Sequence, residues 1–120
     1  MAEVKFINHK GKKIFLMDFS YTKIEEIMAA IEEAKKTIKK HPENSLLGLV
    51  DVRFSAFDNE LFTALKDLAS SDRPYMKVTA VVGVTGLKKL VFMAVRRFTG
   101  RKNLVMFDRM ENAKDWLVEQ

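Results

Sequence analysis

Residues 46–52 read LLGLVDV, and residues 78–84 read VTAVVGV. Both runs are apolar almost without interruption, which is typical of strands that are covered on both faces in a parallel sheet. Between them, Asp58 is placed to cap a helix whose apolar residues recur at helical spacing from Leu61 to Leu68. This stretch therefore predicts two central parallel strands joined by a crossover helix, which is the unit of an α/β domain.

The rest of the chain extends this pattern in both directions. Alternating apolar residues around a turn that contains Asn and Gly predict a hairpin, and helices are predicted where apolar residues share one helical face. The further predicted elements are a hairpin turning at 8–12, a helix opened by the capping box Thr22–Glu25 and stopped by Pro42, a helix over 86–98, a strand over 104–107 and a helix opened by the capping box Asp108–Glu111. The predicted fold class is α/β with the order β-β-α-β-α-β-α-β-α, a mostly parallel five-stranded sheet with an N-terminal hairpin and about four helices.

Length and composition limit what this chain can be. With 120 residues, 48% of them hydrophobic, and a net charge of +5, the sequence predicts a single domain over residues 1–120. It has no cysteine, which excludes disulfides, thiolate nucleophiles and cysteine metal sites and fits a reducing cytoplasm. The charged N-terminus, and apolar runs far shorter than the ~20 residues of a membrane span, predict a cytoplasmic protein with no secretion signal or transmembrane segment.

The sequence contains no group of residues with the spacing of a catalytic site. His9 belongs to the hairpin turn and His41 to a helix end, so both are predicted to be solvated turn or capping residues. We therefore expect a protein that is not an enzyme and that uses no cofactor and no metal.

Short segments along nearly the whole chain share the pattern of one fold family. They are Asn8-His9-Lys10-Gly11-Lys12-Lys13-Ile14, Asp18-Phe19-Ser20, Leu49-Val50-Asp51-Val52, Arg73-Pro74-Tyr75, Ala80-Val81-Val82-Gly83 and Ala113-Lys114-Asp115-Trp116-Leu117. With these segments the chain resembles the SpoIIAA-like or STAS family, the anti-sigma-factor antagonists, and within it the STAS/SEC14-like proteins. The resemblance implies a SpoIIAA-like fold and a role in protein interaction or in binding an apolar ligand.

The resemblance also implies where a regulatory residue would lie. Anti-sigma antagonists carry their regulatory serine in an Asp-Ser-Ser-Gly motif, where the strand equivalent to 46–52 passes into the next helix. This chain has Asp58-Asn59-Glu60-Leu61 there, so the leading acid matches, whereas both serines and the glycine do not. Ser55 is the hydroxyl close by, and the departure puts the phosphorylation switch of that family in question for this chain.

Polar residues follow the predicted parallel strands, at the sheet edge where open α/β sheets bind ligands. Asp18, Asp51 and Ser55 are the candidates there for an alternative function, either a Mg²⁺ site held by carboxylate oxygens or an aspartyl phosphoacceptor. Strand ends are also helix starts, however, and capping alone favours Asp and Ser at these positions. The strand-end site therefore stands as the alternative to a binding module.

The turn Gly83-Val84-Thr85-Gly86 leads from a strand into a helix. Backbone amides and the positive end of the helix dipole can hold an anion at such a turn, with Gly83, Thr85 and Gly86 as candidate residues. The spacing is not that of a P-loop. We favour the simpler interpretation, in which Gly83 is a tight strand exit and Thr85 an ordinary N-cap.

Positive charge is concentrated in the second half of the chain. Residues 1–60 contain 10 basic and 10 acidic side chains, whereas residues 61–120 contain 11 and 6. At about 100° per residue, the helix over 86–98 is predicted to turn one side toward the sheet, formed by Leu87, Leu90, Val91, Ala94, Val95 and Phe98. The predicted partner- or anion-binding residues face outward and are Lys88, Lys89, Phe92, Met93, Arg96 and Arg97.

This surface predicts a protein partner, and a homodimer interface with the cations at its rim is an equal alternative. Four cations near anionic lipid contribute about 1 kcal/mol each, and two inserted apolar side chains about 1.5–3 kcal/mol apiece. Such values permit only weak, reversible contact with a membrane. Nucleic acid ranks lower, because the sequence has no recognition-helix motif and no aromatic residues on an open sheet face. A lipid-like ligand enclosed by the apolar helices is a further alternative.

Overall fold

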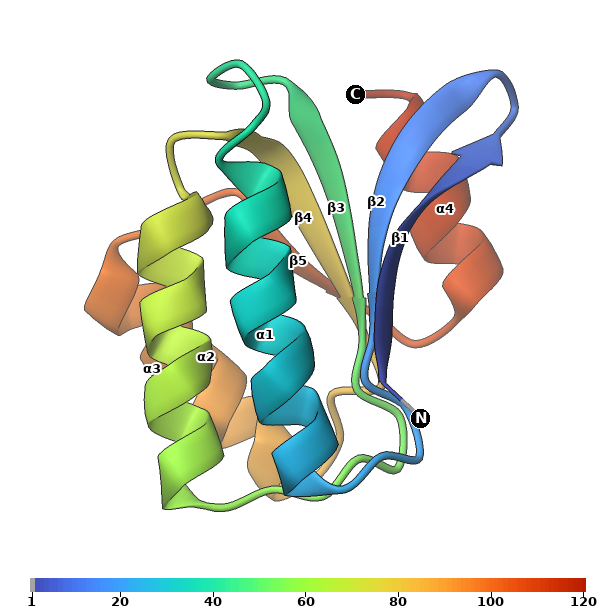
Figure 1. The fold of residues 1–120 in the computed structure, drawn as a ribbon. Helices are drawn as coiled ribbons and strands as arrows, with labels where there is room; N and C mark the ends of the chain where they lie inside the picture. Colours follow the sequence, from blue (N-terminus) through green and yellow to red (C-terminus); the bar gives the residue numbers. More distant parts are fainter. Residues whose placement is uncertain (1) are drawn as a thin grey trace.

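A five-stranded sheet forms the centre of the computed structural model, which describes residues 2–120 apart from the side chain of Leu87. Its strands are β1 (Glu3–His9), β2 (Lys12–Asp18), β3 (Leu46–Asp51), β4 (Met76–Val82) and β5 (Leu104–Phe107). They lie in the order β1-β2-β3-β4-β5, with β1 antiparallel to β2 and all other neighbours parallel (Figure 1). The predicted α/β class and the mostly parallel five-stranded sheet are confirmed.

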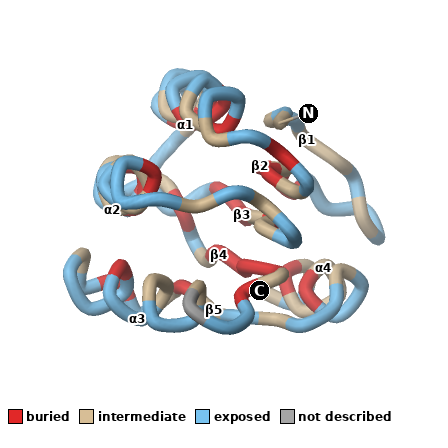
Figure 2. The backbone as a smooth tube through the Cα atoms, turned by 90° about the horizontal axis from the view of Figure 1, so that it is seen from below, coloured by how far each residue is buried: buried red, intermediate tan, exposed pale blue. Residues whose placement is uncertain are grey.

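The four helices of the described chain cover the two faces of this sheet unequally. The helices α1 (Ile24–Ile38), α2 (Asn59–Asp72) and α3 (Leu87–Thr99) each connect two neighbouring parallel strands, so right-handed crossovers place all three on one face. The last helix, α4 (Met110–Val118), lies on the other face (Figure 2). One face is thus covered by three helices and the other by a single one.

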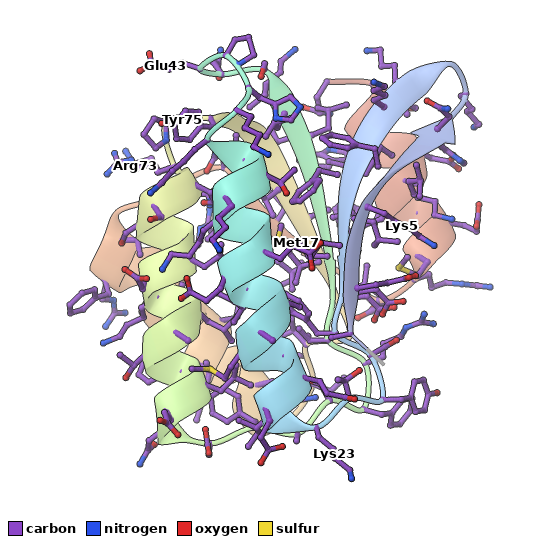
Figure 3. The ribbon with its side chains drawn as sticks, viewed as in Figure 1. Lys5, Met17, Lys23, Glu43, Arg73 and Tyr75 are labelled. Atoms are coloured by element: carbon purple, nitrogen blue, oxygen red, sulfur yellow. The ribbon has the colours of Figure 1, made fainter. Side chains whose placement is uncertain are left out.

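Alternation along β2 sends its side chains into two separate cores. Phe15 and Met17 pack with α1 and α2, and Figure 3 shows Met17 between the sheet and α1. Ile14 and Leu16 pack with α4, where Leu117 is fully buried. Because both faces are covered, the central strands are apolar on both sides, which explains the uninterrupted runs in the sequence.

The hairpin turn consists of two residues, Lys10 and Gly11, with φ angles of 48° and 82°. A two-residue turn with positive φ at both positions matches the twist of paired strands. It pairs His9 with Lys12 and fixes the register of β1 against β2.

The start of α2 is as predicted. The Asp58 carboxylate accepts a hydrogen bond from the Leu61 backbone N–H at 2.8 Å. Capping in this way satisfies one of the free amides of the first helical turn. It holds α2 in the orientation in which Leu61 and Leu68 are buried.

Two other predicted helix caps are wrong. The capping boxes Thr22–Glu25 and Asp108–Glu111 do not form, because α1 and α4 have Lys23 and Arg109 at the N-cap position and neither makes a side-chain cap. The Thr22 hydroxyl instead donates to the Ser20 carbonyl at 2.7 Å. A hydroxyl near a helix start can satisfy a nearby carbonyl as well as an amide, and here the loop carbonyl is the partner.

Candidate functional site

Helix α3 carries the surface that the sequence predicted to bind a partner. It begins after Gly86, which has no side chain to cap it, and it ends at Gly100, which adopts the left-handed conformation with φ 69°. The side of α3 that faces α2 and the sheet includes Val91, Phe92 and Val95. The helix is therefore formed nearly where predicted, but it is rotated about its axis.

The predicted orientation of α3 is partly wrong. Phe92, which was expected to face outward, is half-buried and lines a partly open cavity beneath the helix. Leu90, Ala94 and Phe98, which were expected to face the sheet, are exposed. The inward positions of Val91 and Val95 and the outward position of Met93 agree with the prediction, whereas the side chain of Leu87 lies outside the described residues.

The outward face of α3 combines large apolar side chains with basic ones. Leu90, Met93 and Phe98 are 66%, 55% and 73% exposed. The basic side chains on this face are exposed as well. We define the α3 outer surface by these six residues: Lys89, Leu90, Met93, Arg96, Arg97 and Phe98.

Cations of the neighbouring helix extend this surface. Lys66 of α2 lies over the Phe98 ring, with its Nζ 4.2 Å from the ring centroid. Arg73, which follows α2 and is labelled in Figure 3, donates to the Thr99 carbonyl at 3.2 Å. The segment from Arg73 to Arg109 contains a single acid, Asp108. The exposed apolar groups are thus surrounded by positive charge.

Lys88 differs from the other basic residues of α3 because it points inward. Its Nζ donates to the Val52 carbonyl at 2.9 Å and to Ser55 Oγ at 3.2 Å, both in the connection between β3 and α2. Burial lowers the pKa of Lys88 below its ordinary value. The side chain of Lys88 lines the inner side of α3 together with Val91 and Val95. This is possible because the aliphatic part of a lysine packs against apolar side chains while its ammonium group reaches a polar partner. Lys88 therefore belongs to the cavity beneath α3 and not to the outer surface.

A partly open cavity of about 110 Å³ lies between α2, α3 and the sheet. Its walls are mainly apolar and include Val50, Leu65, Leu68, Val81, Val91 and Val95. Protein cores contain few voids larger than a water molecule. An apolar cavity of roughly 150 Å³ takes up benzene, so a space of this size can hold a small apolar group.

A buried ion pair lines the same cavity near the C-terminal end of α2. Arg101 Nη1 lies 2.6 Å from Asp72 Oδ1, and the guanidinium also donates to Thr79 Oγ1 at 3.1 Å and to Asn103 Oδ1 at 2.9 Å. Burial raises the pKa of Asp72 to about 7, although the Arg101 charge acts to lower it. Sequence reasoning counted Arg101 only among the 11 basic residues of 61–120 and did not place it in the core, because no periodic pattern distinguishes a buried arginine from an exposed one.

The strand-end candidates lie at one edge of the sheet, and each is engaged in its own turn. Asp51 is buried, accepts a hydrogen bond from the Arg53 amide at 3.0 Å and pairs with its guanidinium at 2.8 Å. Asp18 accepts from the Ser20 amide at 3.0 Å and from its hydroxyl at 2.6 Å. Ser55 Oγ donates to the backbone at 3.0 Å. These contacts are those of structural turns, and a phosphoacceptor or metal site at this edge stays a prediction.

The glycine turn before α3 has a clear structural role. Gly83 has φ 93°, and a Cβ at this position would lie 2.6 Å from the Arg53 backbone nitrogen. This close approach agrees with a tight strand exit. Thr85 is not the N-cap as predicted, because Gly86 occupies that position, while the Thr85 carbonyl accepts from the Lys88 amide at 3.0 Å. Anion binding at this turn stays a prediction.

His9 is not the solvated turn residue that the sequence predicted. Its Nε2 lies 2.8 Å from Asp115 Oδ1 of α4, and Lys10 Nζ lies 3.0 Å from the same oxygen. These two hydrogen bonds lower the pKa of Asp115 below its ordinary value. Glu111 brings a second carboxylate within 4.8 Å. The contact ties the hairpin to α4 across more than a hundred residues of sequence, which no local pattern could reveal.

An exposed aromatic pair was also missed by the sequence reasoning. Tyr21 and Phe54 follow β2 and β3, and their ring centroids are 5.0 Å apart. Both residues have positive φ, 53° and 54°, which is uncommon for bulky side chains. Their position depends on the pairing of two loops, with the Tyr21 amide donating to the Arg53 carbonyl at 3.0 Å. No motif within either loop indicated it.

Comparison with known proteins bears on the fold of the whole chain. No family model matches the sequence, and no curated protein matches it. Among solved structures, an anti-sigma-factor antagonist (STAS) domain protein from Planctomyces limnophilus is similar over 98% of this chain and 99% of its own, with a TM-score of 0.66 and 10% sequence identity. The chain has a SpoIIAA-like, or STAS, fold.

The predicted resemblance is thus confirmed for the fold. At 10% identity the STAS likeness concerns the fold alone and assigns no role to any residue of this chain. In the described part of the chain, no helix is both long enough and apolar enough to cross a membrane.

Proposed function

We propose that this STAS-fold chain is a non-enzymatic, cytoplasmic binding or regulatory module that engages an acidic protein partner through the α3 outer surface. The observation that supports the proposal is the exposure of Leu90, Met93 and Phe98 among basic side chains. Gathered apolar side chains on an exposed face mark interaction sites. The similar Planctomyces limnophilus protein is described as an anti-sigma-factor antagonist domain protein, a name that refers to action on another protein.

The composition of the surface favours protein over lipid or nucleic acid. Protein interfaces combine apolar and arginine side chains at their centre with a polar rim, and α3 offers the same combination. Attraction to an anionic bilayer would contribute about 1 kcal/mol of binding free energy per cation. This supports only weak binding once the entropy cost of association is subtracted. Nucleic acid would use the cations through counterion release and would leave Leu90 and Met93 without a role.

Charge reversal on the α3 outer surface tests the proposal. The double variant Lys89→Glu/Arg96→Glu replaces two exposed cations without touching the core. We expect it to melt at the same temperature as the native chain and to lose its partner in a pull-down followed by mass spectrometry. Raising the salt concentration should weaken capture by the native chain as well, since exposed charges are screened.

A matched control separates this surface from net charge. Lys12→Glu/Lys36→Glu makes the same change of charge on β2 and α1, where both lysines are exposed, and it should retain the partner. Equal capture by both double variants would contradict the proposal. Phosphatidylglycerol vesicles test the lipid alternative, and binding of the native chain to these vesicles without capture of any protein would also overturn it.

A further inference from the structure

The cavity beneath α3 has apolar walls and three ionisable groups. Among the described lining residues these are Lys88, Asp72 and Arg101. Asp72 and Arg101 pair with each other at 2.6 Å. Lys88 of α3 lies against the connection that precedes α2 and has neutral partners there, the Val52 carbonyl and Ser55 Oγ. The cavity thus contains one cation that no described carboxylate neutralises.

We propose that this cavity binds the alkyl chain of a carboxylate amphiphile, of the class of medium-chain fatty acids, and that Lys88 holds the carboxylate. An ammonium group has three N–H donors, and two of them are used by Val52 and Ser55. The third can donate to a carboxylate oxygen. Lys88 also lies in the first turn of α3, where the helix dipole adds to its positive charge and no acid opposes it.

The size and opening of the cavity fit this class of ligand. About 110 Å³ is less than the roughly 150 Å³ that takes up benzene, so the enclosed space holds a short alkyl segment. Because the cavity is partly open, the rest of a longer chain can extend out of it. A ligand that was only apolar would leave Lys88 without an ionic partner. This site uses the inner side of α3 and does not depend on the partner proposed for the outer surface.

Methyl-group NMR of the full chain, titrated with octanoate or with 1-octanol, tests the inference. Both probes carry the same number of carbons, but only octanoate has a charged head group. We expect octanoate to shift the methyl signals of Val50, Leu65, Val91 and Val95, which line the cavity. Octanol should shift the same signals more weakly.

Two variants separate the head group from the chain. Lys88→Met keeps the aliphatic stem and removes the charge, and it should weaken octanoate at least about tenfold while leaving octanol unchanged, because charge-assisted hydrogen bonds are lost. Val91→Phe fills the cavity and should abolish the binding of both probes. Leu65→Phe, from the facing helix, makes the same test if Val91→Phe does not fold.

Three results would overturn the inference. The first is that neither probe shifts the signals of the cavity methyls. The second is that the shifts are confined to Leu90 and Met93 on the outer surface. The third is that octanoate binds Lys88→Met as tightly as the native chain, which would show that Lys88 does not hold the carboxylate. In each case the charge-reversal test of the α3 outer surface keeps its meaning, since it does not involve the cavity.

Discussion

Helices α1 and α3 belong to the same layer and have nearly the same length, yet they use their apolar residues differently. In α1, Ile27, Ile31 and Ile38 are all buried against the sheet. In α3, Val95 is buried, whereas Leu90 and Phe98 lie in solvent. Both helices have apolar residues at helical spacing, so the sequence pattern predicts one buried face in each.

Helix α3 thus carries more apolar surface than its packing requires. Exposed large side chains contribute little to the stability of the chain on which they lie. Beneath the same helix, the packing is incomplete and leaves a cavity. We therefore regard α1 as an element of the core and α3 as the element on which the proposed binding depends.

Removing one partner of the buried Asp72–Arg101 pair should destabilise the chain most. Arg101→Met leaves Asp72 buried without its partner and should lower the free energy of unfolding by about 3–5 kcal/mol. Urea denaturation measures this loss. Arg97→Met, on the exposed side of α3, is the matched control and should stay within about 0.5 kcal/mol of the native chain. Equal stability of the two variants would show that the buried pair does not anchor this side.

Truncating one apolar residue in each helix should reveal the different contributions of α1 and α3 to stability. Ile31→Ala in α1 removes buried methyl groups and should cost about 2–5 kcal/mol. Leu90→Ala in α3 removes an exposed side chain and should change the free energy of unfolding by less than about 0.5 kcal/mol. Thermal or urea unfolding measures both. A comparable loss in the two variants would mean that Leu90 is part of the core.

The contact between the hairpin and α4, the single helix on the opposite face, should have the smallest effect on stability. The folded chain lowers the pKa of Asp115 through His9 and Lys10, so its stabilising effect is complete above the ordinary carboxyl value of about 3.9 and is lost as the pH falls through the lowered pKa. In His9→Ala the pKa of Asp115 should rise toward that ordinary value. A carboxyl NMR titration measures it, and an unchanged pKa in the variant would contradict the assigned contact.

Most of the fold could be predicted from the sequence, because its main signals are local. The apolar runs in β3 and β4, the turn glycine Gly11 and the cap at Asp58 each act within a few residues. What could not be predicted depends either on a choice between competing local partners or on a partner far away in the sequence. The Thr22 hydroxyl has two competing partners nearby, and the contact of His9 with Asp115 joins the two ends of the chain.

The candidate site was only partly predictable, because the sequence pattern placed Lys88 on the outer side of α3. A helix with apolar residues on most of its circumference can pack with either of two sides against the sheet. A helical wheel that treats lysine as polar places every lysine on the outer side. The aliphatic stem of Lys88 packs inside while its ammonium reaches the Val52 carbonyl. That contact favours the rotation in which Phe92 is half-buried and Leu90 is exposed. The partner carbonyl belongs to another strand end, so the helix sequence alone could not specify it.

Site-specific photo-crosslinking in cells can show whether the α3 outer surface meets an acidic protein partner. A photoreactive benzoylphenylalanine in place of Met93 reports on the α3 outer surface, and the same residue in place of Lys36 reports on the exposed side of α1. We predict that position 93 crosslinks to one acidic protein, that the product disappears in the Lys89→Glu/Arg96→Glu background, and that position 36 gives no such product. No product from position 93, or the same product from both positions, would show that the α3 outer surface is not the binding site.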